Sequence, residues 1–526
     1  MSSPLDLAMG LELEFLAVYA PGALGPHIPN YASLKRRNPD PDVPLREAGP
    51  AIFHSLLRAG IPATGHEDLD DDEDEVDAAW PEHTRWRVEE DACALSDAER
   101  AALPAGYIVE TIELSSRKFD LQADYWRAEL RRVLDVLHYL ETSSALPITT
   151  NTSSSSSSSS SSTMILPPSG CLFLTNATTG LHVHIGTVSG APLPLPTAKN
   201  LLALATAFER PLDALHAASR IRYPVTETDP ILYAPPSFFH LQHDLHEPPA
   251  DTKPNPNPNP NPVPDNTSTA APLFTWLARI EFAPTYPALA SLLLIHDAVR
   301  FPLIVRGATL GLEGHRSAYN FDNCFGGGFR GWQAACTGTV EFRQHAGTLD
   351  WVEVVVWVGV VVGMVACARA GVERPAEFVG LLARGVDVGF GLEGVLGAFG
   401  VGEEVVDCLL GREEGVVGVL GSERVGGSLV PGGLQRFVRL VECNEAEQNE
   451  RLGEEARAAV MRGKCYGYDI SRREPFHVPV ETVTALLEYY ADVVRRQEGV
   501  TDTQEILSKA KIETLGCLRR LYDAGN

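Results

Sequence analysis

The 526-residue sequence is poor in basic residues and contains no pair of cysteines in a CxxC spacing. Lysine and arginine together number 43, against 69 aspartates and glutamates, and the formal net charge is −26. This charge balance argues against a general nucleic-acid-binding protein, which would present a basic face. The 9 cysteines are scattered and odd in number, which indicates reduced thiols rather than a disulfide framework or a zinc ribbon.

The chain also lacks the sequence features of secretion or membrane insertion. Its first residues have neither the basic nor the apolar region of a signal peptide. The longest apolar run, Val354 to Ala368, is shorter than the roughly 20 residues that a membrane span needs, and charged residues bound it. We therefore expect a cytoplasmic protein that does not contact a membrane, and we predict a buried helix at this run.

Three segments contain few residues that could build a core. One is acidic, one is a serine run and one contains Asn-Pro repeats, and we predict insertions near 66–79, 150–164 and 250–270. The segments before and after them carry the same strand pattern. We therefore predict one large α+β domain spanning 5–371, followed by a mainly helical C-terminal region spanning 372–526.

Regular hydropathy patterns define the elements between these insertions. Alternation with a period of two is typical of strands, and it occurs at Met9–Val18, Ile108–Ser116, Gly180–Gly186 and Val340–His345. Apolar residues at helical spacing predict a helix at Asp124–Leu140. Further helices are predicted at Ala51–Ala59, at Thr197–Phe208 with Thr197 as its cap, at the apolar run from Trp351 onward, and as amphipathic helices at Val480–Arg495 and Thr503–Tyr522.

Charged side chains and histidines gather on one face of each predicted strand. On the last strand, Val340 and Phe342 share the apolar face. The alternate positions Glu341, Arg343 and His345 are predicted to share the other face. Such a row is costly to bury unless the charges serve a ligand, a metal or each other. The four polar faces together carry Glu12, Glu14, Glu113, His182, His184, Glu341, Arg343 and His345.

The residue types in this set indicate a particular chemistry. Carboxylates suit Mg²⁺, which prefers oxygen ligands, and histidine extends the choice to Mn²⁺ or Zn²⁺. Arg343 is not a metal ligand, but a guanidinium is a natural bidentate partner for phosphate or carboxylate. The combination therefore favours metal-bound phosphate chemistry over simple metal-dependent hydrolysis.

Five stretches in a fixed order also carry a family resemblance. They are Gly10-Leu-Glu-Leu-Glu-Phe15, Trp86 to Asp91, Glu113-Leu-Ser-Ser116, Gly180-Leu-His-Val-His-Ile-Gly186 and Thr339-Val-Glu-Phe-Arg-Gln-His-Ala-Gly-Thr348. Between residues 9 and 358 the chain resembles the amidoligase family, which belongs with glutamine synthetase and glutamate–cysteine ligase among the carboxylate–amine ligases. One departure is Ser116, where the family usually carries proline.

The resemblance implies both a fold and an activity. The fold would be a curved, mostly antiparallel sheet with flanking helices, as in glutamine synthetase and glutamate–cysteine ligase, with ATP and Mg²⁺ or Mn²⁺ on the concave face. The activity would be that of an ATP-dependent carbon–nitrogen ligase. It would join small-molecule or peptide carboxylate and amine substrates in an amide or isopeptide bond, through an acyl phosphate.

The resemblance also assigns roles to individual residues. The implied metal ligands are Glu12, Glu14, Glu113, His182 and Glu341. The implied nucleotide-binding residues are Arg343, His184, Arg220, Arg222 and Asn320. The residues implied in catalysis are Arg343, Glu341 and His184.

Two other functions remain open from the sequence. A metal-dependent hydrolase would use the same glutamates and histidines, would need no nucleotide and would favour zinc. A non-catalytic interaction protein on a relict ligase fold would bind partners through its acidic and proline-rich loops. Each strand alone also has a purely structural explanation. Glu12 and Glu14 could form the solvent face of an edge strand. His182 and His184 could be packed histidines, and Glu341 and Arg343 could be partners in cross-strand ion pairs.

Overall fold

A computed structural model describes most of the two regions expected from the sequence. The described residues are 6–37, 45–65, 84–91, 95–123, 125–143, 171–176, 178–208, 211–212, 215–216, 270–289, 319–321, 324, 338–387, 389–409, 434, 437–438, 441, 464–465, 468–469 and 477–525. The three predicted insertions lie outside these residues, except for Ala270, which begins a helix.

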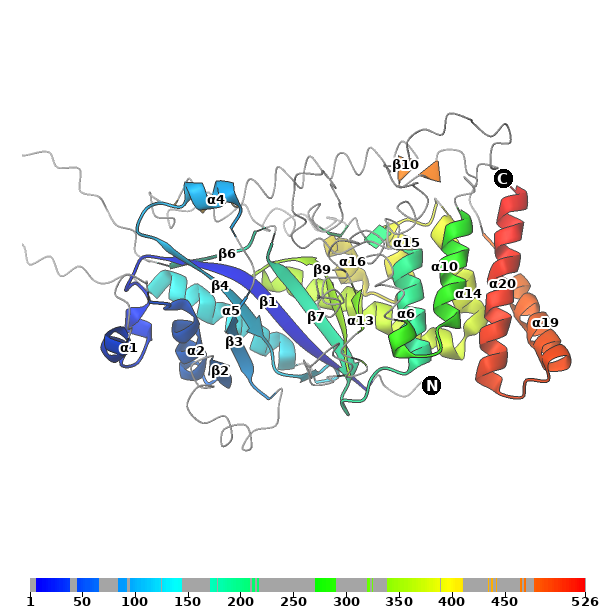
Figure 1. The fold of residues 1–526 in the computed structure, drawn as a ribbon, viewed down its shortest axis with the longest axis horizontal. Helices are drawn as coiled ribbons and strands as arrows, with labels where there is room; N and C mark the ends of the chain where they lie inside the picture. Colours follow the sequence, from blue (N-terminus) through cyan, green and yellow to red (C-terminus); the bar gives the residue numbers. More distant parts are fainter. Residues whose placement is uncertain are drawn as a thin grey trace, which may run out of the picture.

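The described chain is a mixed α/β structure built on one open, mostly antiparallel sheet (Figure 1). The strands are β1 (Leu7–Tyr19), β2 (Ala63–Gly65), β3 (Trp86–Glu90), β4 (Ile108–Ser115), β5 (Phe119–Asp120), β6 (Cys171–Leu174), β7 (Gly180–Thr187), β8 (Tyr319–Asn320) and β9 (Val340–Ala346). Their order is β2-β3-β4-β1-β7-β9-β8, with β5 and β6 paired to β1, and β2 and β3 are parallel. A separate pair joins β10 (Lys464–Cys465) and β11 (Tyr468–Asp469).

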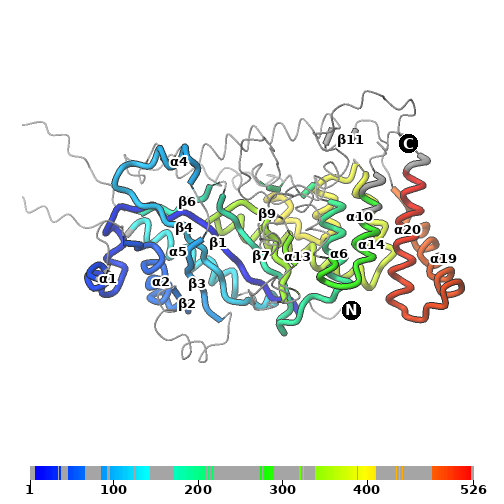
Figure 2. The backbone as a smooth tube through the Cα atoms, viewed as in Figure 1, coloured from blue at the N-terminus to red at the C-terminus, as the bar shows by residue number. Residues whose placement is uncertain are grey.

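Strand β1 is the centre of the sheet, and Figure 2 shows it passing between β4 and β7. Its apolar side chains Leu11, Leu13 and Phe15 are buried in the main core. The intervening positions, Glu12 and Glu14, lie on the opposite face because side chains alternate along a strand. All four predicted strands are confirmed.

Helices lie on both sides of the sheet. They are α1 (Tyr31–Arg37), α2 (Ala48–Arg58), α4 (Asp97–Ala102), α5 (Tyr125–Ser143), α6 (Leu195–Ala207), α10 (Ala270–Phe282), α13 (Trp351–Glu373), α14 (Pro375–Ala383), α15 (Leu392–Ala398), α16 (Glu403–Leu409), α19 (Val480–Glu498) and α20 (Thr503–Gly525), with the 3-10 turns η1 (Gly25–His27) and η6 (Arg384–Val386). Helix α4 packs through Ala102 on a second core at the polar face, whereas the other helices pack on the apolar face or continue beyond it as a helical layer. Helix α6 packs on α13 and α10, and α20 packs on α10 and α19. All six predicted helices are present.

A second, smaller core covers one end of the polar face. On β1, the face that carries Glu12 and Glu14 continues as Leu16 and Val18, and these two residues pack in this core rather than in the main one. Their partners there are Leu172, Leu174, Leu434, Phe437, Val438 and Val441. The polar segment of the sheet face therefore begins where this apolar cover ends.

Helix α13 contains the long apolar run. Asp350 caps its N-terminus, because the carboxylate accepts hydrogen bonds from the backbone N–H groups of Val352 at 2.7 Å and Glu353 at 3.1 Å. Among the described helices, α13 alone is long and apolar enough to cross a membrane, and 50% of its apolar window is buried inside the protein. A core helix passes the same test, and its packing on α5, α6, α14 and β7 agrees with the predicted buried helix.

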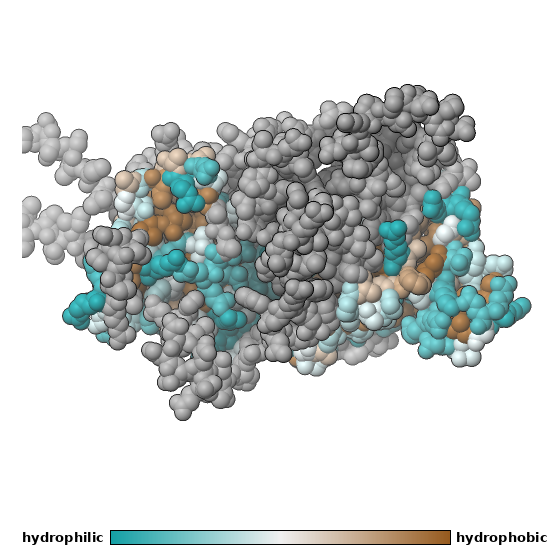
Figure 3. Space-filling model, in the orientation of Figure 1, coloured by the Kyte–Doolittle hydropathy of each residue, from teal (hydrophilic) through white to brown (hydrophobic). Residues whose placement is uncertain are grey.

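The two C-terminal helices, α19 and α20, form a hairpin at one end of the molecule. Figure 3 shows a mainly hydrophilic surface there, on the side in view. Large apolar side chains are exposed singly, among them Tyr489 at 63% and Leu521 at 47%. Scattered exposure of this kind is normal for a protein surface.

Candidate metal and phosphate site

The pairing of five strands brings the predicted polar residues together. Glu12 on β1 stands opposite His182 on β7 and Ser115 on β4. In the neighbouring row, His184 on β7 stands opposite Glu341 on β9. Directly paired residues of antiparallel strands have Cβ atoms about 5 Å apart on one face. The register therefore makes one continuous polar surface from side chains far apart in the sequence.

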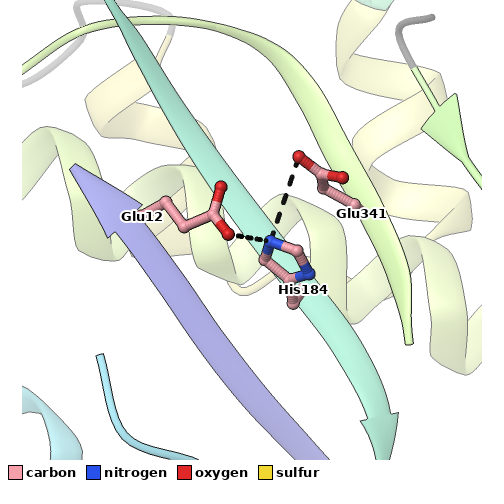
Figure 4. A group of neighbouring side chains, drawn as sticks. All are labelled: Glu12, His184 and Glu341. Carbon is pink, nitrogen blue, oxygen red and sulfur yellow. Dashed lines mark ion pairs between the residues drawn. The ribbon is translucent and has the colours of Figure 1, made fainter. Parts of the chain in front are cut away.

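The first group of ligand-type side chains consists of Glu12, His184 and Glu341 (Figure 4). One ligand atom from each lies within 4.8 Å of the others. Nε2 of His184 lies 2.9 Å from Glu12 Oε1 and 3.9 Å from Glu341 Oε1. The hydroxyl of Thr339 lies 3.3 Å from Nδ1 of the same imidazole. When Nδ1 donates to this hydroxyl, the lone pair of Nε2 faces the two carboxylates.

The second group consists of Glu14, Asp91 and Glu113, which also place one oxygen each within 4.8 Å of one another. Glu14 and Glu113 are directly paired across β1 and β4. Asp91 follows the last residue of β3, and its backbone N–H donates to Thr111 at 3.2 Å. Asp91 was not among the predicted ligands. The signal in the sequence was its place in the acidic cluster that ends the stretch Trp86 to Asp91.

His182 lies between the two groups and contacts both. Its Nδ1 is 2.9 Å from Glu12 and 3.5 Å from Glu341, and its Nε2 is 3.4 Å from Glu14. The imidazole is only 2% exposed. Both ring nitrogens are thus engaged with carboxylates, so His182 links the two groups while remaining outside each of them.

A glycine makes room for this histidine. The backbone N–H of Gly180 donates to Glu14 Oε2 at 2.6 Å. A Cβ at position 180 would lie 2.6 Å from Nε2 of His182, closer than real Cβ contacts allow. A larger residue here would therefore displace the His182 ring or the Glu14 carboxylate from its place in the site.

Arg343 and Asn320 hold the two oxygens of the Glu341 carboxylate. The Arg343 guanidinium donates a hydrogen bond to Oε1, and the Asn320 amide donates to Oε2 at 2.9 Å. Glu341 is 3% exposed, whereas the Arg343 side chain remains 26% exposed. Asn320, predicted to bind nucleotide, thus lies at the site in contact with a candidate metal ligand.

The register of β7 and β9 changes within the site. Leu181 pairs with His345, whereas Val183 pairs with Phe342. Two residues of β9 therefore stand opposite the single residue His182 of β7. This arrangement is a β-bulge in β9. Alternation along β9 is interrupted at this point.

The bulge makes one placement from the sequence wrong. His345 was predicted to share a face with Glu341 and Arg343, but it lies on the opposite face against α13. Its ring centroid is 5.4 Å from that of Trp357, and its Nε2 is 3.6 Å from Glu353. Strict alternation fails here because the extra residue turns His345 to the helix side.

The charged groups of the site shift one another's pKa values. Burial raises the pKa of Glu12, but His184 and His182 more than offset this effect and hold it well below its usual value. Burial lowers the pKa of His184, yet Glu12 and Glu341 raise it to about 9. Burial raises the pKa of Glu341, but Arg343 and His184 outweigh burial and leave this pKa lowered. A positive charge is therefore favourable within the first group.

In the second group, burial raises the pKa of Glu113, and the neighbouring carboxylates Glu12, Glu14 and Asp91 raise it further. The hydroxyl of Ser115 opposes this shift by donating to Glu113 at 2.8 Å. Crowded carboxylates of this kind favour the entry of a cation, which replaces their mutual repulsion with attraction.

Ser116, where the amidoligase family usually has proline, closes the ladder between β1 and β4. Its backbone N–H donates to Leu11 O at 2.7 Å, and its hydroxyl accepts from Leu11 N at 2.8 Å. Proline has no N–H and no hydroxyl, so it would lose both hydrogen bonds. The departure thus has a local structural role.

The structure brings together eight of the ten predicted site residues. They are Glu12, Glu14, Glu113, His182, His184, Asn320, Glu341 and Arg343. Arg220 and Arg222 lie outside the described residues. The donor set fits divalent cations, because the first group offers oxygen and nitrogen and the second offers oxygen alone.

Comparisons with known proteins add nothing to the class of this protein, which is therefore defined by its fold and its site. No family model, no curated protein and no solved structure matches the chain. The class is therefore a mixed α/β protein with a mostly antiparallel open sheet, which bears an acidic histidine cluster and an arginine on one face.

Proposed function

We propose that the protein is an ATP-dependent carboxylate–amine ligase of the amidoligase type. The observation that carries the proposal is the joint placement of two three-residue ligand groups and Arg343 on one sheet face. Acids and histidines alone suit many metal enzymes. The guanidinium beside them favours a substrate with phosphate groups.

The residues of the two groups have distinct preferences as cation ligands. Glu14, Asp91 and Glu113 offer only oxygen, which suits Mg²⁺. Glu12, His184 and Glu341 add an imidazole nitrogen, which Mn²⁺ accepts more readily than Mg²⁺ does. Bound Mg²⁺ or Mn²⁺ would neutralise the negative charge of the phosphate groups.

Arg343 is proposed to bind the transferred phosphoryl group. Its side chain is partly exposed and is directed to the site by its contact with Glu341. A guanidinium held in this way meets two phosphate oxygens without reorganisation, and it stabilises charge that develops during transfer. His184 is proposed to contribute a ring nitrogen at the same place.

The proposed reaction has two steps. A carboxylate oxygen of the first substrate forms a bond to the γ-phosphorus of ATP, and ADP leaves with the electrons of the broken P–O bond. The amine nitrogen of the second substrate then forms a C–N bond to the acyl carbon, and phosphate leaves. One amide or isopeptide bond is formed, and one proton is released. The protein orients the groups and neutralises their charge.

The fold supports the same proposal. Helices cover one face of the sheet, while the other face carries the charged cluster beside a small apolar cover. This division agrees with the ligase-like arrangement implied by the resemblance, in which the nucleotide and metals occupy the open face. A role for Arg220 and Arg222 in nucleotide binding stays part of the proposal.

Calorimetric titration tests the nucleotide site. We expect a non-hydrolysable ATP analogue to bind the purified chain only with Mn²⁺ or Mg²⁺ present. Arg343→Ala should weaken this binding by about tenfold or more, because it removes a charge-assisted contact. The matched control is Arg496→Ala, which removes an arginine that is 77% exposed on α19. Equal affinity in Arg343→Ala and the control would exclude Arg343 from the phosphate site.

A metal-dependent hydrolase is the second candidate, and the mixed histidine and carboxylate group favours it. The same titration separates the two functions. Tight zinc binding without nucleotide affinity would favour the hydrolase. A folded chain that binds neither metal nor nucleotide would favour an interaction protein on a relict fold.

A further inference from the structure

A buried amide group of β9 has no partner for its oxygen. The side chain of Gln344 is only 5% exposed. Within the part of the chain that the structure describes, its Oε1 accepts no hydrogen bond. A buried polar atom without a partner destabilises a protein, so such an atom calls for a specific explanation.

The β-bulge places Gln344 at the candidate site. Phe342 and His345 pair with the apolar-face residues Val183 and Leu181. The two residues between them, Arg343 and Gln344, both stand opposite His182, whose ring contacts the site carboxylates. Gln344 is therefore adjacent to both the arginine and the linking histidine. Simple alternation along the strand would instead have put it on the apolar face.

The chemistry of the position favours one kind of ligand. An unpartnered amide oxygen needs an N–H or O–H donor. Glu12, Glu14 and Glu341 surround His182, and their negative charge attracts a cation. A phosphate group fits less well, because it would bring acceptors to an acceptor, and Arg343 already offers donors for it. The ligand that meets both demands is a protonated primary amine.

We propose that Gln344 binds the amine substrate through Oε1, and this inference rests on the proposed ligase function. The amine would then lie next to the phosphoryl group held by Arg343. After losing one proton, its nitrogen forms the C–N bond to the acyl carbon while the C–O bond to phosphate breaks. Phosphate leaves with that electron pair and takes up a proton, and one further proton passes to water. Gln344 thereby selects substrates that carry N–H donors.

The stability of the ligand-free protein gives the first test. Gln344→Met replaces the amide with an apolar side chain of similar length. We expect the thermal midpoint to rise by about 2 °C, because a buried oxygen without a partner is removed. A fall of the midpoint would overturn the inference, since it would mean that the amide has a structural partner. Gln497→Met, at an exposed position of α19, is the matched control and should leave the midpoint unchanged.

Two isomeric cations give the second test. n-Butylammonium and tetramethylammonium have the same formula and charge, but only the first has N–H donors. We expect n-butylammonium to raise the thermal midpoint of the native protein and tetramethylammonium to leave it unchanged. The n-butylammonium effect should be lost in Gln344→Met and kept in Gln497→Met. Equal responses to both cations, or an undiminished response in Gln344→Met, would overturn the assignment.

The same samples separate this inference from the proposed function. Mn²⁺ titration of the native protein reports the metal site and does not involve Gln344. Absence of Mn²⁺ binding would refute the proposed function, whatever the amine response. Normal Mn²⁺ binding with identical amine responses in all proteins would leave the ligase function in place and refute the role of Gln344.

Discussion

At the scale of single residues, polar groups outside the two ligand groups fix the orientation of the ligands. The Thr339 hydroxyl lies 3.3 Å from Nδ1 of His184, and the Asn320 amide donates to Glu341 at 2.9 Å. A Cβ at Gly186 would lie 3.0 Å from the Thr339 side chain, so Thr339 is held close to β7. Such outer partners select the tautomer and angle of a metal-binding histidine.

Substitution of Thr339 should therefore weaken cation binding. Thr339→Val keeps the branched shape but removes the hydroxyl. We expect Mn²⁺ affinity to fall by about tenfold, a typical cost of losing an outer partner of a ligand. Thr339→Ser keeps the hydroxyl and should stay close to native affinity in the same titration. A loss in Thr339→Ser with native affinity in Thr339→Val would mean that the methyl contact with β7, and not the hydroxyl, supports His184.

The sequence allowed the residues of this site to be predicted wherever strands alternate strictly. Glu12, His182 and His184 are on the expected face because β1 and β7 have regular pairing over this stretch. Gln344 and His345 could not be placed, because the bulge arises from the pairing of two distant strands and has no local signal. The position of the bulge follows only from the pairing of β9 with β7.

At the scale of elements, a partly buried ion pair joins helix α5 to the sheet. Arg117, just after β4, donates two hydrogen bonds to Glu129 on α5, at 2.7 Å and 2.6 Å. The indole of Trp86 on β3 donates to the same carboxylate at 2.9 Å. Burial raises the pKa of Glu129, but Arg117 and Trp86 outweigh burial and leave it lowered. The pair thus fixes α5 against two strands that carry site residues.

The contribution of this pair should depend on pH. Because the folded-state pKa of Glu129 is below its unfolded value, the stabilisation is present above the unfolded pKa. It is lost as pH falls through the folded pKa. We expect Glu129→Gln to cost about 2 kcal/mol of unfolding free energy at pH 7, and this cost should shrink as pH falls below about 4.5. Denaturant unfolding at a series of pH values measures the difference. A cost that does not change with pH would show that the carboxylate charge is not its source.

Long elements were predictable, whereas short ones were not. The periodic patterns of α5, α19 and α20 extend over 19 to 23 residues, so several turns repeat the same apolar face. Helix α13 was predictable from its long continuous apolar run. Strands β5 and β8 have two residues each and cannot show alternation. They form because β1 and β9 offer free edges, which is a tertiary cause.

At the scale of the whole molecule, the core does not divide at the predicted boundary between 371 and 372. Helix α13 runs through this point to Glu373. One hydrophobic core contains residues from Leu7 to Tyr522. Helix α20 packs on α10, where Lys511 lies 3.4 Å from Glu281 in a partly buried ion pair. The C-terminal helices therefore share their core with the sheet that carries the site.

Truncation tests how far the sheet depends on this shared core. A chain ending after residue 373 keeps α13 whole but removes α14, α19 and α20, which leaves apolar surface of α6 and α10 without cover. Uncovered apolar area favours association, so we expect the truncated chain to aggregate in gel filtration and to bind no Mn²⁺. The full chain and Gln497→Met serve as folded references. If the truncated chain eluted as a single species and bound Mn²⁺ like the full chain, residues 1–373 would be an independent domain. The C-terminal helices would then need a role other than completing the core.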